Sequence, residues 1–180
     1  MRRTIFKLFW AWDFEKEEKW INEMSIKGLH LCGVGLCKYV FDEGTPGEYI
    51  HRMEMLDKAP AHPESMQYIR FIEDTGAEHI GSLMRWVYFR KKTGGSGFDL
   101  FSSLDSRISH LNRILLIFGI LLGFNIFSSI NNLGFWLSSG ITVNLIIVFI
   151  HLIFTAWLGY GFIRLYLKKC KLKKQKILHE

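Results

Sequence analysis

The chain has 180 residues, of which 49% are hydrophobic, and a formal net charge of +6. Its first 110 residues carry 15 Lys and Arg against 16 Asp and Glu, whereas residues 111–180 carry eight against one. The positive charge therefore lies outside the balanced N-terminal part, and the lack of a basic folded face excludes nucleic acid from the expected partners.

The start of the chain predicts a strand followed by a helix. Thr4–Trp12 is aromatic and β-branched with apolar residues on both parities, which is typical of a strand covered on more than one side. Asp13 is suited to cap a helix over residues 14–27, and Gly28 is suited to end it. The sequence lacks a recognisable signal peptide, so we expect the N-terminus to start and remain in the cytoplasm.

The next segments predict a pair of strands. Leu29–Phe41 is typical of a strand with a weak centre at Gly33 and Gly35. Turn-forming residues at 42–47 then lead into Glu48–Leu56, whose alternating pattern predicts a half-buried strand that pairs with the preceding one.

A second helix and a last strand complete the predicted N-terminal domain. Pro63 favours a helix start and Gly76 a helix stop, and Leu83–Lys91 again has the character of a strand. The resulting order over residues 1–92 is β-α-β-β-α-β. It predicts an α+β domain of the ferredoxin-like type, in which two helices cover one face of a four-stranded antiparallel sheet.

The uncovered face of that sheet is the predicted binding surface. Aromatic side chains of the strands gather there, and the candidate partner-binding residues are Trp10, Tyr39, Trp86 and Tyr88. Because a large exposed apolar patch is unusual on a monomer, we expect a covering protein surface, either a protein partner or a second copy of the chain. Alternatively, the membrane-proximal helix packs against this face, or a small molecule binds there.

Residues 93–113 predict a linker and an amphipathic helix. The glycine-rich start of this segment is typical of a flexible connection. Apolar residues then recur at helical spacing at Leu100, Leu104, Ile108 and Leu111. This helix either lies on the membrane surface or begins the first span.

The stretch Leu115–Ile163 contains no Asp, Glu, Lys or Arg. A span needs about 20 apolar residues, so residues 114–165 predict two transmembrane helices, at about 114–130 and 142–165, before a basic tail at 166–180. The basic residues at this membrane surface are Arg164, Lys168, Lys169, Lys171, Lys173, Lys174 and Lys176. Basic residues flank both spans and the connecting loop has none, so we expect a multi-pass cell-membrane protein with both termini in the cytoplasm and membrane lipid as a partner.

Three polar residues lie inside the predicted spans: Asn125, Asn144 and His151. An intramembrane histidine is a functional candidate because an unpaired polar group is costly there. A neutral histidine is also an ordinary hydrogen-bond partner between two helices, and this structural interpretation is favoured.

Known catalytic and metal-binding patterns are missing from the sequence. No nucleophile with a base, no catalytic pair of carboxylates and no metal-ligand spacing is recognisable, so we expect no metal and no cofactor. Cys32 and Cys37 resemble small buried hydrophobes and do not form a disulfide framework. Cys170 lies beside the second span, where acylation is one option and an unmodified thiol the other.

Four motifs resemble the bacterial domain of unknown function 2812. They are Trp12-x2-Glu15-Lys16-Glu17-x2-Trp20, Gly47-Glu48-Tyr49-Ile50-x-Arg52-x-Glu54, Thr75-Gly76-Ala77-Glu78 and Trp86-Val87-Tyr88-Phe89-Arg90-Lys91. The resemblance covers residues 4–113 and implies a bacterial membrane protein with no assigned activity, often encoded beside PadR-type repressors. It carries over no catalytic residue.

Together these observations predict a non-enzymatic integral membrane protein. Its cytoplasmic domain would be a sensing, regulatory or partner-binding module. The alternative function is an accessory subunit of a membrane transport, export or resistance system, in which the spans would be the working part.

Overall fold

The computed structural model describes residues 1–94, 98–100 and 104–179. The chain divides into two compact units, Met1–Ser102 and Ser103–Glu180, called unit 1 and unit 2 below. Each unit is described by itself.

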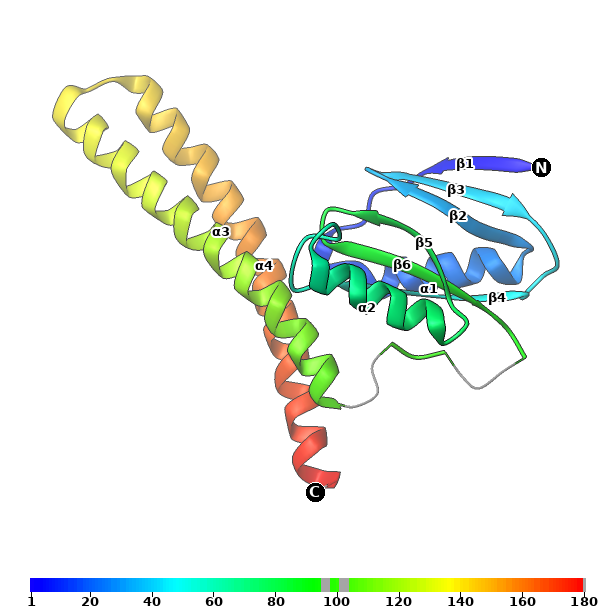
Figure 1. Ribbon diagram of the computed structural model, residues 1–180. Coiled ribbons are helices and arrows are strands. Elements are labelled where there is room, and N and C mark those ends of the chain that lie inside the picture. The colour runs from blue at the N-terminus through cyan, green and yellow to red at the C-terminus, as the bar shows by residue number, and fades with distance from the viewer. Residues whose placement is uncertain (95–97, 101–103, 180) are drawn as a thin grey trace. The chain divides into compact units, whose positions relative to one another are not determined.

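Unit 1 is built from two halves with the same order of elements (Figure 1). The first half contains β1 (Arg2–Phe6), a 3₁₀ turn η1 (Ala11–Asp13), α1 (Phe14–Ile26), β2 (Leu29–Gly35) and β3 (Lys38–Glu43). The second half contains β4 (Tyr49–Met55), α2 (Pro63–Asp74), β5 (Glu78–Leu83) and β6 (Trp86–Lys92). Each half forms its own antiparallel three-stranded sheet, with the orders β1-β3-β2 and β4-β6-β5.

The two halves also share their local irregularities. Gly28 follows α1 at φ 80° and Gly76 follows α2 at φ 85°, so each helix ends in the left-handed conformation that glycine adopts without strain. The register then shifts between Leu31 and Gly33 in β2 and at the corresponding place in β5. Unit 1 is therefore an internally repeated βαββ arrangement.

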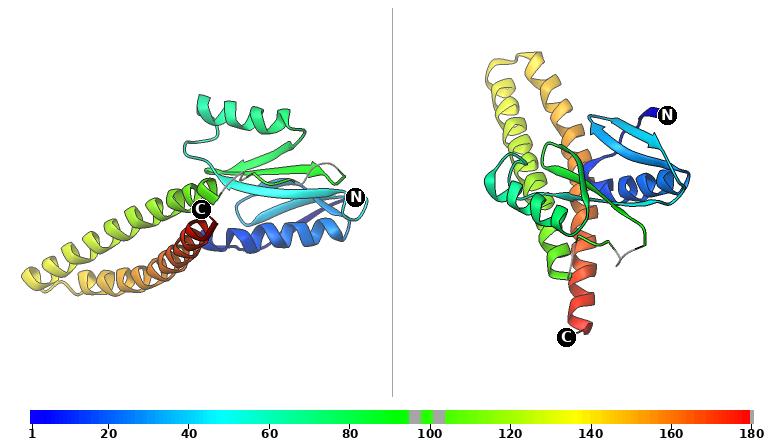
Figure 2. Two further views of the ribbon diagram at one scale, coloured as in Figure 1. Left: turned by 90° about the horizontal axis from the view of Figure 1, so that it is seen from below. Right: turned by 45° about the vertical axis from the view of Figure 1, so that its right-hand side comes forward.

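Apolar packing holds the strands against the helices, and in the left view of Figure 2 the strands of unit 1 lie between α1 and α2. In the second half, α2 packs on β5 and β6 around a cluster of buried residues: Leu56, Ile69, Ile72, Ala77, Val87, Phe89 and Phe98. In the first half, Ile21 of α1, Leu31 of β2 and Phe41 of β3 are at most 1% exposed.

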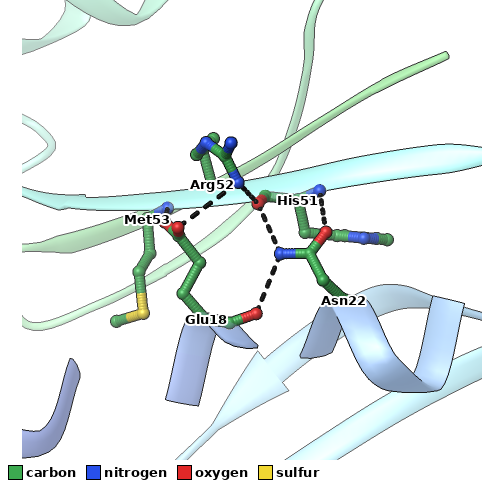
Figure 3. A network of polar contacts seen from close by, with 5 residues as sticks. All are labelled: Glu18, Asn22, His51, Arg52 and Met53. Atoms are coloured by element: carbon green, nitrogen blue, oxygen red, sulfur yellow. Dashed lines mark hydrogen bonds and ion pairs between the residues drawn. The ribbon is translucent and has the colours of Figure 1, made fainter. Parts of the chain in front are cut away.

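The free edge of β4 is covered by side chains of α1 (Figure 3). The amide of Asn22 accepts a hydrogen bond from the His51 backbone N–H at 2.8 Å and donates to the His51 carbonyl at 2.9 Å. Two residues further along β4, the Met53 backbone N–H donates to Glu18 Oε2 at 3.0 Å. The Arg52 guanidinium donates to the other oxygen of the same carboxylate, Oε1, at 3.3 Å. These side chains satisfy backbone groups that a neighbouring strand would otherwise bind.

The predicted class is confirmed: an α+β domain precedes a hairpin of two long apolar helices. The ferredoxin-like order fits roughly, with two additional strands. Residues 29–41 are not one strand, because the chain turns at Leu36 and Cys37, where Cys37 has φ 54°, and continues as β3. The strand β5 was not predicted.

Two further details of unit 1 correct the sequence analysis. β4 does not pair with the strand before it, because its partner is β6 in a separate sheet. The strand expected over Thr4–Trp12 is limited to Arg2–Phe6, since the chain forms a 3₁₀ turn before α1.

Unit 2 consists of two helices, α3 (Leu104–Ser139) and α4 (Thr142–His179). Their mean hydropathies reach 2.0 and 2.1 over windows long enough to cross a bilayer, so by length and composition both can span a membrane. α3 is continuous from Leu104, so residues 104–113 of the predicted amphipathic segment begin the first long helix, whereas Leu100 lies before it and residues 101–103 lie outside the described ranges. The turn expected over residues 131–140 is helical up to Ser139.

Candidate functional site

A pocket of about 180 Å³ lies within unit 1, between α1 and the two sheets. Its walls are formed by residues from α1, from the segment before η1, and from strands β3 and β6 of the two sheets. Among these lining residues are Phe9, Phe14, Glu17, Tyr39, Trp86 and Tyr88. At its mouth lie the tips of the two hairpins, where Leu36 and Met84 are 77% and 83% exposed.

One carboxyl group, that of Glu17, lies at the wall of this pocket and joins the two halves of unit 1. Tyr39 of β3 donates a hydrogen bond to Glu17 Oε1 at 2.8 Å, and Tyr88 of β6 donates to the same oxygen at 2.7 Å. All three side chains are buried. Since both hydroxyls donate to Oε1, Oε2 receives no hydrogen bond from the described residues.

The position of Glu17 follows from the helical repeat of α1. Phe14, Glu17 and Ile21 are three and four residues apart, so they lie on one face of the helix, and all three are buried. Glu17 was not among the candidate site residues selected from the sequence. The spacing to Phe14 and Ile21 is the signal that could have identified Glu17 as the inward-facing member.

Burial sets the protonation of this cluster. Removal from water raises the pKa of Glu17 above its usual value, while the hydrogen bonds from Tyr88 and Tyr39 act in the opposite direction. Burial, followed by the negative charge of Glu17, raises the pKa of both tyrosines. Among the described residues Glu17 forms no ion pair with a basic side chain, so the two phenols are the groups that favour its ionised form against the cost of burial.

Aromatic rings form the wall beside this carboxyl group. The rings of Phe9 and Trp20 lie 5.5 Å apart, and the Trp20 ring meets Tyr39 edge-on at 5.1 Å. The Lys7 ammonium lies 4.9 Å from the centre of the Phe9 ring and 4.5 Å from that of Trp20. These are cation–π distances. Lys7 and Phe9 line the pocket and Trp20 does not, so the rings at this side already accommodate one positive charge of the chain itself.

The structure brings three of the four candidate aromatic residues together. Tyr39, Trp86 and Tyr88 all line the pocket, with the Trp86 ring 5.6 Å from Phe14. Tyr39 and Tyr88 are buried and hydrogen-bonded to Glu17, not displayed on an open sheet face as expected. The fourth residue, Trp10, stacks on Trp12 at 5.7 Å.

A larger hollow of about 520 Å³ runs along α1 and β4. Its lining includes Glu18, Asn22 and Arg52, whose polar atoms are engaged in the network that covers the β4 edge (Figure 3). The smaller pocket is the stronger candidate because its carboxyl group has no counter-ion among the described residues.

A second buried polar cluster braces the loop before β4. Ser25 Oγ donates to the Tyr49 carbonyl at 2.6 Å and lies 2.9 Å from His30 Nδ1. His30 Nε2 lies 2.9 Å from the Thr45 carbonyl oxygen, and the His51 ring stacks on His30 at 6.4 Å. The hydrogen-bond partners of Ser25 and His30 named here are backbone carbonyls and each other, which identifies a structural brace.

His51 makes stability sensitive to acid. Burial, followed by the electrostatic influence of His30 and Arg90, lowers the pKa of His51 from 6.5 to about 3. The unfolded chain binds a proton below pH 6.5 and the folded chain does not, so the stabilisation is complete above pH 6.5 and is lost as pH falls toward 3.

We therefore expect His51→Phe to flatten the acid side of the stability profile. Between pH 7 and pH 5, the free energy of unfolding of the native protein should fall by about 2 kcal/mol more than that of this variant. Urea unfolding of unit 1 in the full chain, followed at both pH values, measures the difference, and Met53→Leu on the same strand is the control. Parallel profiles for the native protein and His51→Phe would contradict the assignment.

The polar residues of unit 2 form hydrogen bonds between its two helices. Thr155 Oγ1 donates to Asn125 Oδ1 at 2.8 Å, and Ser128 Oγ lies 3.0 Å from His151 Nε2. Asn144 lies in the first turn of α4, where its backbone N–H donates to the Ile141 carbonyl. The candidates Asn125 and His151 thus have the interhelical hydrogen bonds that the structural interpretation expects.

The basic membrane-surface residues all lie along the C-terminal part of α4. Lys176 Nζ is 2.8 Å from Asp105 Oδ1 at the start of α3, which ties the two ends of the hairpin together. Cys32, Cys37 and Cys170 are free thiols, and within the described ranges no group of three or more His, Cys, Asp or Glu could hold a metal ion.

The fold and the pocket define a class of protein: a repeated α+β domain with an internal aromatic pocket, joined to two helices able to span a membrane. The chain belongs to the family described as Protein of unknown function (DUF2812), whose sequence model matches residues 13–122. This match begins just before α1 and ends within α3. No curated protein and no solved structure matches the chain.

Proposed function

We propose that this protein is a non-enzymatic, membrane-anchored sensing protein whose N-terminal domain binds a small ligand. The observation that carries the proposal is the pocket in which Glu17, Tyr39 and Tyr88 converge from three different elements. A carboxyl group oriented by two phenols and surrounded by rings is suited to recognise a ligand. Binding sites are typically apolar concavities that contain a small number of convergent polar groups.

The two helices of unit 2 serve as the anchor in this proposal. Basic residues precede α3 and crowd the end of α4, while the connection near Gly140 has no charge. The positive-inside rule then places the N-terminal domain and the C-terminal tail on the cytoplasmic side. A protein partner or a second copy of the chain is the proposed recipient of the signal, as expected for a regulatory module.

A photoreactive residue in place of Leu36 tests the proposal in native membranes. Leu36 lies at the pocket mouth and is 77% exposed, so the probe should capture a small molecule that mass spectrometry detects as an adduct in unit 1. The matched control replaces Phe71 of α2, which is 62% exposed outside the pocket lining. Identical adducts at both positions, or none at Leu36, would refute a ligand-binding pocket.

The alternative function, an accessory transport subunit, assigns the working role to the polar residues of the spans. If these residues only join the helices, His151→Leu should weaken the hairpin by about 0.6 kcal/mol and leave ligand capture at Leu36 unchanged. Steric trapping or gel-shift unfolding of the hairpin measures the first effect, with Phe149→Leu on the same helix as the control. Loss of capture in His151→Leu would favour the transport function instead.

A further inference from the structure

The carboxyl group of Glu17 is buried without a counter-ion among the described residues. It is 7% exposed, two tyrosine hydroxyls donate to one of its oxygens, and none of the causes that shift its pKa is a neighbouring basic side chain. A buried ionised carboxylate is costly unless a cation pairs with it. Burial therefore raises the pKa of Glu17, and a cation beside Oε2 would favour its ionised form. Lys7 also lines the pocket, but it forms no ion pair with Glu17.

The surrounding rings are suited to a particular kind of cation. Phe14 and Trp86 pack together at the pocket wall, and Phe9 with Trp20 already holds the Lys7 ammonium at cation–π distance. Aromatic faces attract weakly hydrated organic cations such as quaternary ammonium groups, whose charge they stabilise without hydrogen bonds. A metal ion would instead require several oxygen, nitrogen or sulfur ligands.

The size of the pocket limits the ligand to a small head group. A volume of about 180 Å³ is below the usual range for a whole drug-sized ligand, so only part of a larger molecule would enter. The exposed apolar residues at the mouth, Leu36 and Met84, provide a surface on which an apolar tail could lie outside the pocket.

We propose that the pocket binds an organic cation, with its ammonium head beside Glu17 Oε2 and between the aromatic rings. This inference rests on the proposed function and names its ligand class. An anionic ligand would oppose ionisation of Glu17, and a neutral ligand would not offset the cost of a charge in this buried position. Lys7 lies on the same aromatic wall and repels the incoming cation, so its replacement by methionine should strengthen binding.

A pair of probes with the same shape and different charge tests the ligand class. Choline carries a trimethylammonium group, and 3,3-dimethylbutan-1-ol carries a neutral tert-butyl group in its place. Both are titrated into the full-length protein in non-ionic detergent, and the indole N–H signal of Trp86 is followed by NMR with Trp157 as the internal reference. Choline is expected to bind at least about tenfold more tightly than the alcohol.

Two variants of α1 show whether Glu17 causes the preference for the charged probe. Glu17→Gln should bring the affinity ratio of the two probes close to one without weakening the neutral probe, whereas Glu23→Gln, exposed on the same helix, should preserve the ratio. Tyr88→Phe removes one hydrogen bond to Glu17 and serves as a second variant if Glu17→Gln does not fold.

The outcomes separate the ligand class from the proposed function. Equal affinity for both probes, or a ratio that survives Glu17→Gln, would overturn the organic cation. Capture of a small molecule at Leu36 would in that case still support a ligand-binding pocket. Failure of choline to shift Trp86, together with no capture at Leu36, would overturn both.

Discussion

Gly28→Ala is expected to destabilise unit 1 by about 3 kcal/mol, and the equivalent change in the second half, Gly76→Ala, by about 1 kcal/mol. Both glycines have nearly the same left-handed φ, so both variants incur the same conformational cost. They differ in their surroundings. A Cβ at Gly28 would lie 2.8 Å from the Gly44 carbonyl oxygen, whereas the nearest atom to a Cβ at Gly76 is the Lys91 side chain at 3.9 Å.

The comparison of these two variants separates backbone strain from collision. The Gly44 carbonyl belongs to a loop backbone. The Gly44 N–H donates a hydrogen bond to the Gly28 carbonyl at 2.9 Å, so the loop cannot move away without losing that bond. Urea unfolding of the full chain in mild detergent, with amide exchange of unit 1 as the readout, gives both free energies. Equal losses of unfolding free energy in the two variants would show that the close approach at Gly28 does not contribute to the destabilisation.

Asn22→Ala is expected to destabilise unit 1 by about 2–4 kcal/mol. The asparagine amide donates to one backbone group of His51 and accepts from the other, and His51 is 2% exposed. Removing the amide leaves both backbone groups unsatisfied in a position that water reaches poorly. Asn22→Asp retains an acceptor for the His51 N–H but sets a carboxylate oxygen against the His51 carbonyl, so it should not recover the lost stability.

The neighbouring surface position provides the control for Asn22. Lys19 lies one turn away on α1, and its side chain is 79% exposed, so Lys19→Ala should change the free energy of unfolding by less than about 0.5 kcal/mol. Hydrogen exchange at the His51 amide gives a local readout, and it should accelerate in Asn22→Ala. Unchanged protection of that amide would mean that α1 does not seal the β4 edge.

Much of the local structure could be predicted from the sequence. Periodicity and capping indicated both helices of unit 1, and the start expected at Pro63 is the start observed. The strand boundaries were harder to predict. The β2–β3 and β5–β6 turns use Leu36-Cys37 and Met84-Arg85, and neither pair carries the Asn-Gly or Asp-Gly signal that marks a hairpin.

The pocket shows why the site was only partly predictable. Three of its aromatic residues were selected because aromatic side chains are conspicuous on strands. Glu17 was not selected, because its burial depends on tyrosines that come from two different sheets, one of them 71 residues away along the chain. The helical spacing to Phe14 and Ile21 indicates that Glu17 faces inward, but it does not reveal the two tyrosines that bind it.

The sequence by itself determined the membrane-type helices and the class of the N-terminal domain. An uncharged apolar run and a helical repeat are local properties, so they are visible wherever they occur. Only the tertiary structure decided that the strands separate into two repeated sheets and that a carboxyl group of α1 joins them. Strand pairing and burial arise from contacts between distant residues, and their free energy is set by which partners meet in space.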